Sequence, residues 1–111
     1  MQNTFKKTLL ATAAASLIAG AAHADIKVGV ILGFTGPIES LTPAMADSAE
    51  LAFDEASNSG LLLGGDSIVS VRGDSTCVDA AAATAAAERL VNSDGVVAIM
   101  GADCSGVTGA I

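Results

Sequence analysis

Residues 26–37 read IKVGVILGFTGP, and this stretch decides the fold. Its first seven residues are mostly apolar and rich in β-branched side chains, so they predict a strand buried on both faces. Residues 33–37, with two glycines and a proline, end the strand in a turn. Strands buried on both faces are typical of parallel sheets that helices cover on each side.

Strand and helix patterns alternate along the rest of the chain. The predicted elements are a helix that Thr42 caps and Asn58 to Gly60 end, a strand at 67–72, a helix at 78–92, a strand at 96–100 and a helix that begins near Val107. This order predicts an α/β fold in which a βαβαβ parallel sheet has flanking helices and right-handed crossovers. Ligands of such sheets bind beyond the carboxyl ends of the strands, here residues 33–41, 74–77 and 102–108.

The N-terminal segment has the pattern of a secretory signal peptide. Lys6 and Lys7 precede an uncharged run from Leu9 to Ala22, and residues 22–24 (Ala-His-Ala) form a cleavage site. The run is shorter than the ~20 residues of a spanning helix, which disfavours the alternative of a membrane anchor. We therefore predict a signal peptide at 1–24, export to the periplasm and a partial domain at 25–111.

Charge and histidine content exclude several functions. Lys6 and Lys7 are two of five basic residues, so cleavage would change the formal charge from −7 to −9. Such a chain repels phosphate backbones, so we expect no nucleic-acid partner. Cleavage would also remove His23, the only histidine. Without it the chain lacks a Ser-His-Asp triad, a Cys-His pair and a histidine-containing zinc site, and we expect no cofactor or metal.

Two cysteines, Cys77 and Cys104, remain after cleavage. An even number in an oxidising compartment favours a disulfide, and two free buried thiols are the alternative. On the chain-entropy model, this cross-link would stabilise the fold by about 3–4 kcal/mol.

The glycine-rich loop at residues 101–109 does not match an enzyme motif. Val107 stands where a phosphate-binding loop needs lysine, and Asp103 stands where a nucleophile elbow needs glycine. A small-residue loop that leads into a helix still offers free amides to an anion such as a carboxylate, with hydroxyls from Ser105 and Thr108. The alternative is that Ser105 only caps the helix.

Asp74 and Asp103 follow two of the three strands. They suit a paired-carboxylate centre for acid–base chemistry. The favoured alternative is that they cap and solvate turns, where aspartate is common.

Five stretches of the sequence carry a family resemblance. Residues 25–30 (DIKVGV), 34–37 (FTGP) and 49–56 (AELAFDEA) resemble the opening of type I periplasmic binding proteins. Residues 74–77 (DSTC) and 101–105 (GADCS) resemble two cysteine-bearing loops of the leucine/isoleucine/valine-binding proteins of ABC transporters. The resemblance covers essentially all of residues 25–111.

The resemblance implies a structure and a site. Family members have two α/β lobes that close on the ligand, so this chain would supply the first part of the N-terminal lobe. It implies a Cys77–Cys104 disulfide near the cleft and a ligand carboxylate on Ser105, beside Cys104 and Thr108. The family's aromatic residue after the Thr-Gly-Pro turn has no counterpart in residues 38–41 (IESL).

In this topology the first strand lies between the second and third. The two cysteines follow the outer strands, so the distance between these strands limits whether a disulfide can form. Strands two apart are about 9–10 Å apart, whereas a disulfide needs Cα atoms within ~7 Å. Because both cysteines lie beyond their strand ends, we expect their loops to converge above the first strand.

The resemblance implies a monomeric periplasmic protein without catalysis. It would capture a branched-chain amino acid or similar small solute for an ABC transporter permease. The alternatives are a sensory ectodomain of the same fold, an enzyme whose catalytic residues lie elsewhere, and a gene fragment without function. We also expect a truncated chain, because the last predicted helix begins just before Ile111.

Overall fold

The structure is a computed structural model that describes residues 25–62 and 64–111. The predicted signal peptide lies outside the described residues. The elements are β1 (Asp25–Leu32), α1 (Thr42–Asn58), β2 (Ser67–Asp74), α2 (Ala80–Arg89), a single π-helical turn η1 (Leu90–Asp94), β3 (Ala98–Gly101) and α3 (Ser105–Ala110). Among these elements, no helix has both the length and the apolar character needed to cross a membrane.

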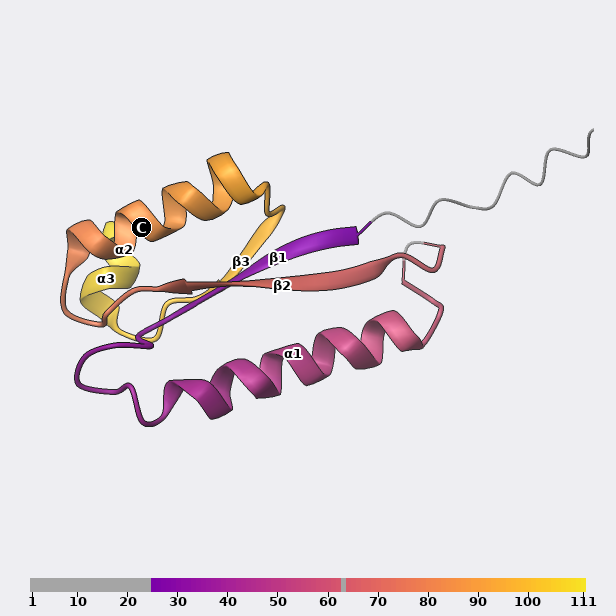
Figure 1. Cartoon of the computed structure of the whole chain (residues 1–111), viewed down its shortest axis with the longest axis horizontal. Coiled ribbons are helices and arrows are strands. Elements are labelled where there is room, and N and C mark those ends of the chain that lie inside the picture. The colour runs from indigo at the N-terminus through magenta and orange to yellow at the C-terminus, as the bar shows by residue number, and fades with distance from the viewer. Residues whose placement is uncertain (1–24, 63) are drawn as a thin grey trace, which may run out of the picture.

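β1 is the central strand of a three-stranded parallel sheet with the order β2-β1-β3. At the end of β1, Leu32 lies opposite Asp74 of β2, and Ile31 lies opposite Gly101 of β3. The carboxyl ends of all three strands therefore meet at one edge of the sheet, on the left of Figure 1. The predicted βαβαβ sheet is confirmed, including the central position of the first strand.

Helices cover both faces of the sheet, with α1 on one side and α2, with α3 beside it, on the other (Figure 1). Successive side chains of a strand point to opposite faces, so β1 contributes to two cores. Val30 and Leu32 pack with Ala46 of α1. Ile31 packs on the other face with Leu90, at the end of α2. Burial on both faces explains why β1 is almost continuously apolar.

The helix predicted at residues 78–92 begins later, at Ala80, because Asp79 caps it. One oxygen of the Asp79 carboxylate accepts hydrogen bonds from the amides of Ala81 and Ala82, at 2.9 and 3.0 Å. A cap of this kind satisfies amides that have no partner within the helix.

The third strand is shorter than predicted, because β3 begins at Ala98 instead of Val96. The Val96 side chain is buried against Leu90, whose carbonyl accepts the Val96 amide hydrogen at 3.1 Å. The amide of Val97 donates to the Lys27 carbonyl at 2.9 Å, and the Val97 side chain remains 74% exposed. Val96 therefore closes the α2 side of the core before the strand begins.

Thr42 does not cap the first helix, contrary to the prediction. It is the first residue of α1 and follows Leu41, which takes the cap position without a side-chain hydrogen bond. The buried Thr42 hydroxyl lies 3.1 Å from the Gly33 carbonyl and 3.4 Å from the Glu39 carbonyl. Thr42 thus ties the start of α1 to the loop that follows β1.

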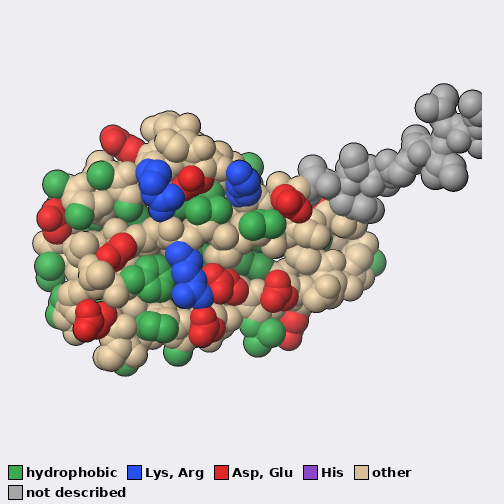
Figure 2. Space-filling view, viewed as in Figure 1, with side chains coloured by type: hydrophobic (Ala, Val, Ile, Leu, Met, Phe, Trp, Pro, Cys, Tyr) green, Lys and Arg blue, Asp and Glu red, His purple; other side chains and the backbone are tan. Residues whose placement is uncertain are grey.

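Basic side chains on the face drawn in Figure 2 lie beside acidic ones. Arg72 Nη2 lies 2.7 Å from Asp47 Oδ1 and 2.6 Å from Glu50 Oε2, and Arg89 pairs with Asp94. The hydrogen bonds that Arg72 donates to Glu50 and then to Asp47 raise the pKa of Arg72, and the bonds to Glu50 lower the pKa of that carboxyl group. Solvent-exposed pairs of this kind contribute about 0–1 kcal/mol each to stability.

Candidate functional site

Three loops leave the carboxyl edge of the sheet: residues 33–41 after β1, residues 75–79 after β2 and residues 102–104 after β3. The first two are joined where the strands end, because the Ser75 amide donates to the Leu32 carbonyl at 2.8 Å. The segments that the sequence predicts for this edge are therefore brought together there.

A disulfide joins the second and third loops. Cys77 and Cys104 have an S–S distance of 2.01 Å and a Cα–Cα distance of 5.2 Å. The bond crosses above β1, because a Cβ atom at Gly33 would lie 3.2 Å from Cys77 Cβ. The loops therefore converge over the central strand, as expected, although β2 and β3 are not adjacent.

The backbone of the second loop is left-handed at two residues that are not glycine. Thr76 has φ 57° and Cys77 has φ 69°, a region that costs such residues about 1–2 kcal/mol each. A hydrogen bond of 2.8 Å from the Thr76 amide to Asp74 Oδ1 and the Cys77 disulfide hold this conformation. The first loop packs directly on it, since a Cβ atom at Gly36 would lie 2.5 Å from the Thr76 carbonyl oxygen.

Asp74 fastens the first loop to the second. Its carboxylate accepts hydrogen bonds from the Thr35 hydroxyl at 2.6 Å, the Thr35 amide at 3.2 Å and the Thr76 amide at 2.8 Å. Partial burial raises the pKa of Asp74, but these hydrogen bonds outweigh burial, so the pKa is lowered overall. Asp74 is therefore an ionised anchor of the loops.

Asp103 connects all three loops. Its Oδ2 accepts a hydrogen bond from the Gly33 amide at 2.8 Å, and its Oδ1 lies 3.4 Å from the hydroxyl of Ser75, which is fully buried. Both Asp74 and Asp103 thus accept bonds from loop amides and hydroxyls. This arrangement agrees with the turn-stabilising alternative and not with a pair of reacting carboxylates.

Ser105 is the first residue of α3, just beyond the carboxyl edge of the sheet. Cys104 is the N-cap residue, in an extended conformation, and no side chain caps the helix. The alternative that Ser105 caps the helix is therefore wrong. The first amide of this turn with a helical partner is that of Thr108, which donates to the Cys104 carbonyl at 2.9 Å. The amides of residues 105–107 precede it, and the Ser105 side chain is exposed.

Thr108 lies one turn after Ser105. Its hydroxyl lies 2.9 Å from the Cys104 carbonyl and 3.2 Å from the Ala102 carbonyl. A hydroxyl has one proton. While that proton is shared with these carbonyls, Thr108 can offer a ligand only an acceptor, whereas the sequence suggests a donor at this position.

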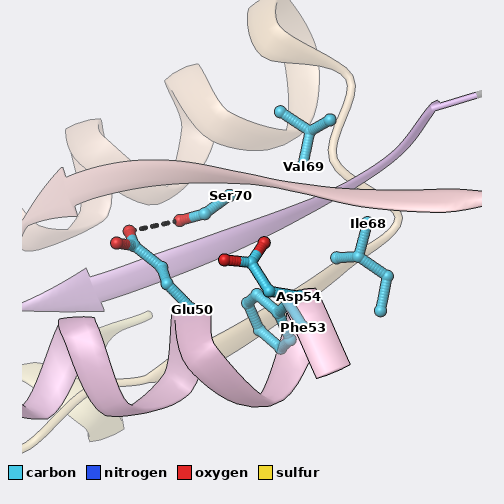
Figure 3. A pocket seen from close by; sticks show the side chains of 6 residues that line it. All are labelled: Glu50, Phe53, Asp54, Ile68, Val69 and Ser70. Carbon is cyan, nitrogen blue, oxygen red and sulfur yellow. Dashed lines mark hydrogen bonds between the residues drawn. The ribbon is translucent and has the colours of Figure 1, made fainter. Parts of the chain in front are cut away.

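A groove of about 370 Å³ lies elsewhere, between α1 and the outer edge of β2 (Figure 3). It is lined by Glu50, Phe53, Asp54, Ile68, Val69 and Ser70. The Ser70 hydroxyl donates a hydrogen bond to Glu50 at 2.8 Å. It precedes the end of β2 by four residues, about 13 Å along the strand. The groove is therefore separate from the candidate site.

Two contributors to the site are not evident from the sequence. Ser75 and Thr35 are small polar residues in predicted turns, and only the fold shows that they hold Asp103 and Asp74. The sequence signal is limited to their positions just after buried strands. Pairing them with the aspartates requires the register of β1 against β2, which no local pattern supplies.

The parallel sheet with helices on both faces is the fold of an α/β lobe. A family model described as periplasmic binding protein matches residues 25–111. The chain belongs to this family, and the resemblance drawn from its sequence is confirmed.

Two relatives of the chain are named as binding proteins. The chain is 40% identical over 103 residues to "Leu/Ile/Val-binding protein homolog 7" of Brucella melitensis, covering 91% of this chain and 25% of that protein. It is 35% identical over 102 residues to "Leu/Ile/Val-binding protein BraC3" of Rhizobium johnstonii, covering 91% and 27%. The chain thus spans about a quarter of the length of the curated relatives it matches.

Solved structures agree with these relatives. The branched-chain amino acid transporter substrate-binding protein LivJ of Streptococcus pneumoniae, in complex with isoleucine, matches with a TM-score of 0.69 and 30% identity, covering 78% of this chain and 24% of that one. The leucine-binding protein LivK of Thermotoga maritima matches with a TM-score of 0.57 and 27% identity, covering 78% and 23%.

Proposed function

We propose that residues 25–111 form the first part of the N-terminal lobe of a solute-binding protein that captures a branched-chain amino acid for an ABC transporter permease. The names of the relatives and the isoleucine bound to LivJ support this function. The observation that carries it is the convergence of three loops beside the free amides at the start of α3.

The proposed site binds the ligand through its carboxylate. The amides of Ser105 and Gly106, which are exposed residues, and the Ser105 hydroxyl are donors, and carboxylates accept hydrogen bonds from such groups. Cys104 and Thr108 flank these donors. A zwitterionic amino acid has no net charge, so the acidic character of the chain does not repel it.

The remaining parts of the proposal follow from the family. The protein acts as an exported periplasmic monomer, binds without catalysing a reaction and releases its ligand to the permease. A second lobe closing over the loops would add contacts and raise the affinity. Relatives of this kind are named as binding or transport proteins, which supports a role without catalysis.

The test is a titration of the ¹⁵N-labelled chain with L-isoleucine, followed by amide chemical shifts. We expect shifts concentrated at residues 102–108 and weak binding, because one lobe supplies only part of the contacts. Ser105→Ala should weaken the affinity about fivefold, the value of one hydrogen bond of ~1 kcal/mol. Ser48→Ala, which removes a hydroxyl from the exposed face of α1, is the matched control.

A second ligand tests the carboxylate. 3-Methylbutylamine keeps the leucine side chain and amine but lacks the carboxylate, so it should leave residues 102–108 unshifted. Equal affinity for the amine, or equal affinity of the Ser105→Ala and unsubstituted chains, would refute the proposed site.

A further inference from the structure

Asp103 is the one side chain in the described residues that hydrogen-bonds to both other loops of the carboxyl edge. It reaches the Gly33 amide, 70 positions earlier in the chain, and the Ser75 hydroxyl, 28 positions earlier. Gly33 follows the central strand, and the Ser75 amide is itself bonded to β1 through Leu32. The carboxylate therefore links the third loop to the residues that follow the ends of β1 and β2.

Asp103 lies next to the residues of the proposed ligand site in the chain, so its hydrogen bonds also fix where those residues lie. It immediately precedes Cys104, the cap residue of α3, and lies two residues before Ser105. Cys104 is fixed on the side of the second loop by its disulfide to Cys77. The disulfide fixes the distance between the second and third loops. Asp103 fixes the distance between the third loop and the first.

We propose that Asp103 is the positioning residue of the ligand site, an inference that rests on the proposed function. Its carboxylate holds the three loops in register, so that the first amides of α3 and the Ser105 hydroxyl face the ligand in a fixed arrangement. Asp103 acts through the loops, because its two oxygens accept hydrogen bonds from the first and the second loop.

The chemistry of this contact favours a carboxylate. The Gly33 amide can only donate, and the Ser75 hydroxyl donates here, so the group between them accepts twice in this structure. An asparagine has the same shape but is neutral, and its NH₂ group keeps contact with Ser75 only if the hydroxyl turns to accept. Asp103→Asn therefore weakens both contacts with little change in volume, and the segment that leads into α3 is held less firmly.

The experiment uses the ¹⁵N-labelled chain and its Asp103→Asn variant. Charge-assisted hydrogen bonds are shorter and stronger than neutral ones, so the Gly33 amide proton should move upfield in the variant. The amides of residues 105–107 should also shift or broaden. The dissociation constant for L-isoleucine should rise about tenfold. Asp54→Asn, the same chemical change on the exposed side of α1, is the matched control.

A purely structural role predicts a different result. Ala52→Gly destabilises α1 at an exposed position away from the loops, and it should lower the melting temperature without changing the affinity of the folded chain. If Asp103→Asn behaves like Ala52→Gly, with the Gly33 and Ser105 amides unmoved and the affinity retained, the inference is overturned.

Failure of the proposed function gives a distinct result. If the unsubstituted chain shows no shifts with L-isoleucine, the proposed function fails. The role of Asp103 in positioning the loops is then tested by comparing spectra of the two chains without ligand. Displaced Gly33 and Ser105 amides in Asp103→Asn would then support its role in positioning the loops, and unmoved amides would overturn it. Binding by the unsubstituted chain and the variant with equal affinity would overturn only the role of Asp103.

Discussion

Single residues matter most at the carboxyl edge, because backbone segments meet there without intervening side chains. Gly101, the last residue of β3, has φ 121°, and a Cβ atom on it would lie 1.9 Å from the Ile31 carbonyl oxygen. No side chain fits this space. The sequence marks a loop at this glycine, but the reason for it is a carbonyl of another strand.

Gly101→Ala should destabilise the chain by at least about 3 kcal/mol, since the added methyl group forces β1 and β3 apart. Gly60→Ala is the control, because Gly60 has a positive φ of 68° but open space around its Cβ position. It should cost only about 1–2 kcal/mol. Urea unfolding followed by circular dichroism measures both values. Similar losses in the two variants would show that the close approach to Ile31 is unimportant.

At the scale of elements, the sequence predicts the type and order of helices and strands better than their ends. Periodicity and composition are local, so they identify the strand at 26–32 and the alanine-rich helix. The start of that helix depends on a side-chain cap at Asp79, and the start of β3 depends on Val96 packing under Leu90. These ends are set by contacts between elements.

α3 has six residues and depends on its neighbours for stability, because isolated helices of that length do not persist in water. The Cys77–Cys104 disulfide holds its cap residue. Replacing both cysteines by serine should lower the free energy of unfolding by about 3–4 kcal/mol and speed amide exchange in α3. Thermal melts and hydrogen exchange measure the two effects.

The control for this experiment is the reductant. A phosphine reductant should reproduce the loss in the unsubstituted chain and leave the double-serine variant unchanged. Retention of slow exchange in α3 after reduction would contradict the dependence of α3 on the disulfide.

For the whole molecule, the free energy of unfolding should fall at acid pH, because the fold lowers the pKa values of two carboxyl groups. The pKa values of Asp74 and Glu50 are both lowered, the first by hydrogen bonds from Thr35 and Thr76 that outweigh burial, the second mainly by Arg72. A lowered pKa in the folded state contributes stability above the unfolded value, near 4, that is lost as pH falls through the folded value.

Asp74→Asn should therefore lower stability at pH 7 and flatten its decline below about pH 4. Urea unfolding at a series of pH values measures this decline. Thr35→Val keeps the carboxylate but removes its shortest hydrogen bond, so it should show part of the effect. An unchanged decline in Asp74→Asn would show that another group controls acid unfolding.

The sequence by itself determined the α/β class, the order of the elements and the edge at which the loops gather, because burial on both faces and helical periodicity are written in neighbouring residues. The tertiary structure decided which groups meet there. Asp103 binds the amide of Gly33 across 70 positions, and Cys77 reaches Cys104 above β1. Such contacts depend on strand register and on left-handed loop backbone, which arise only when distant segments pack together.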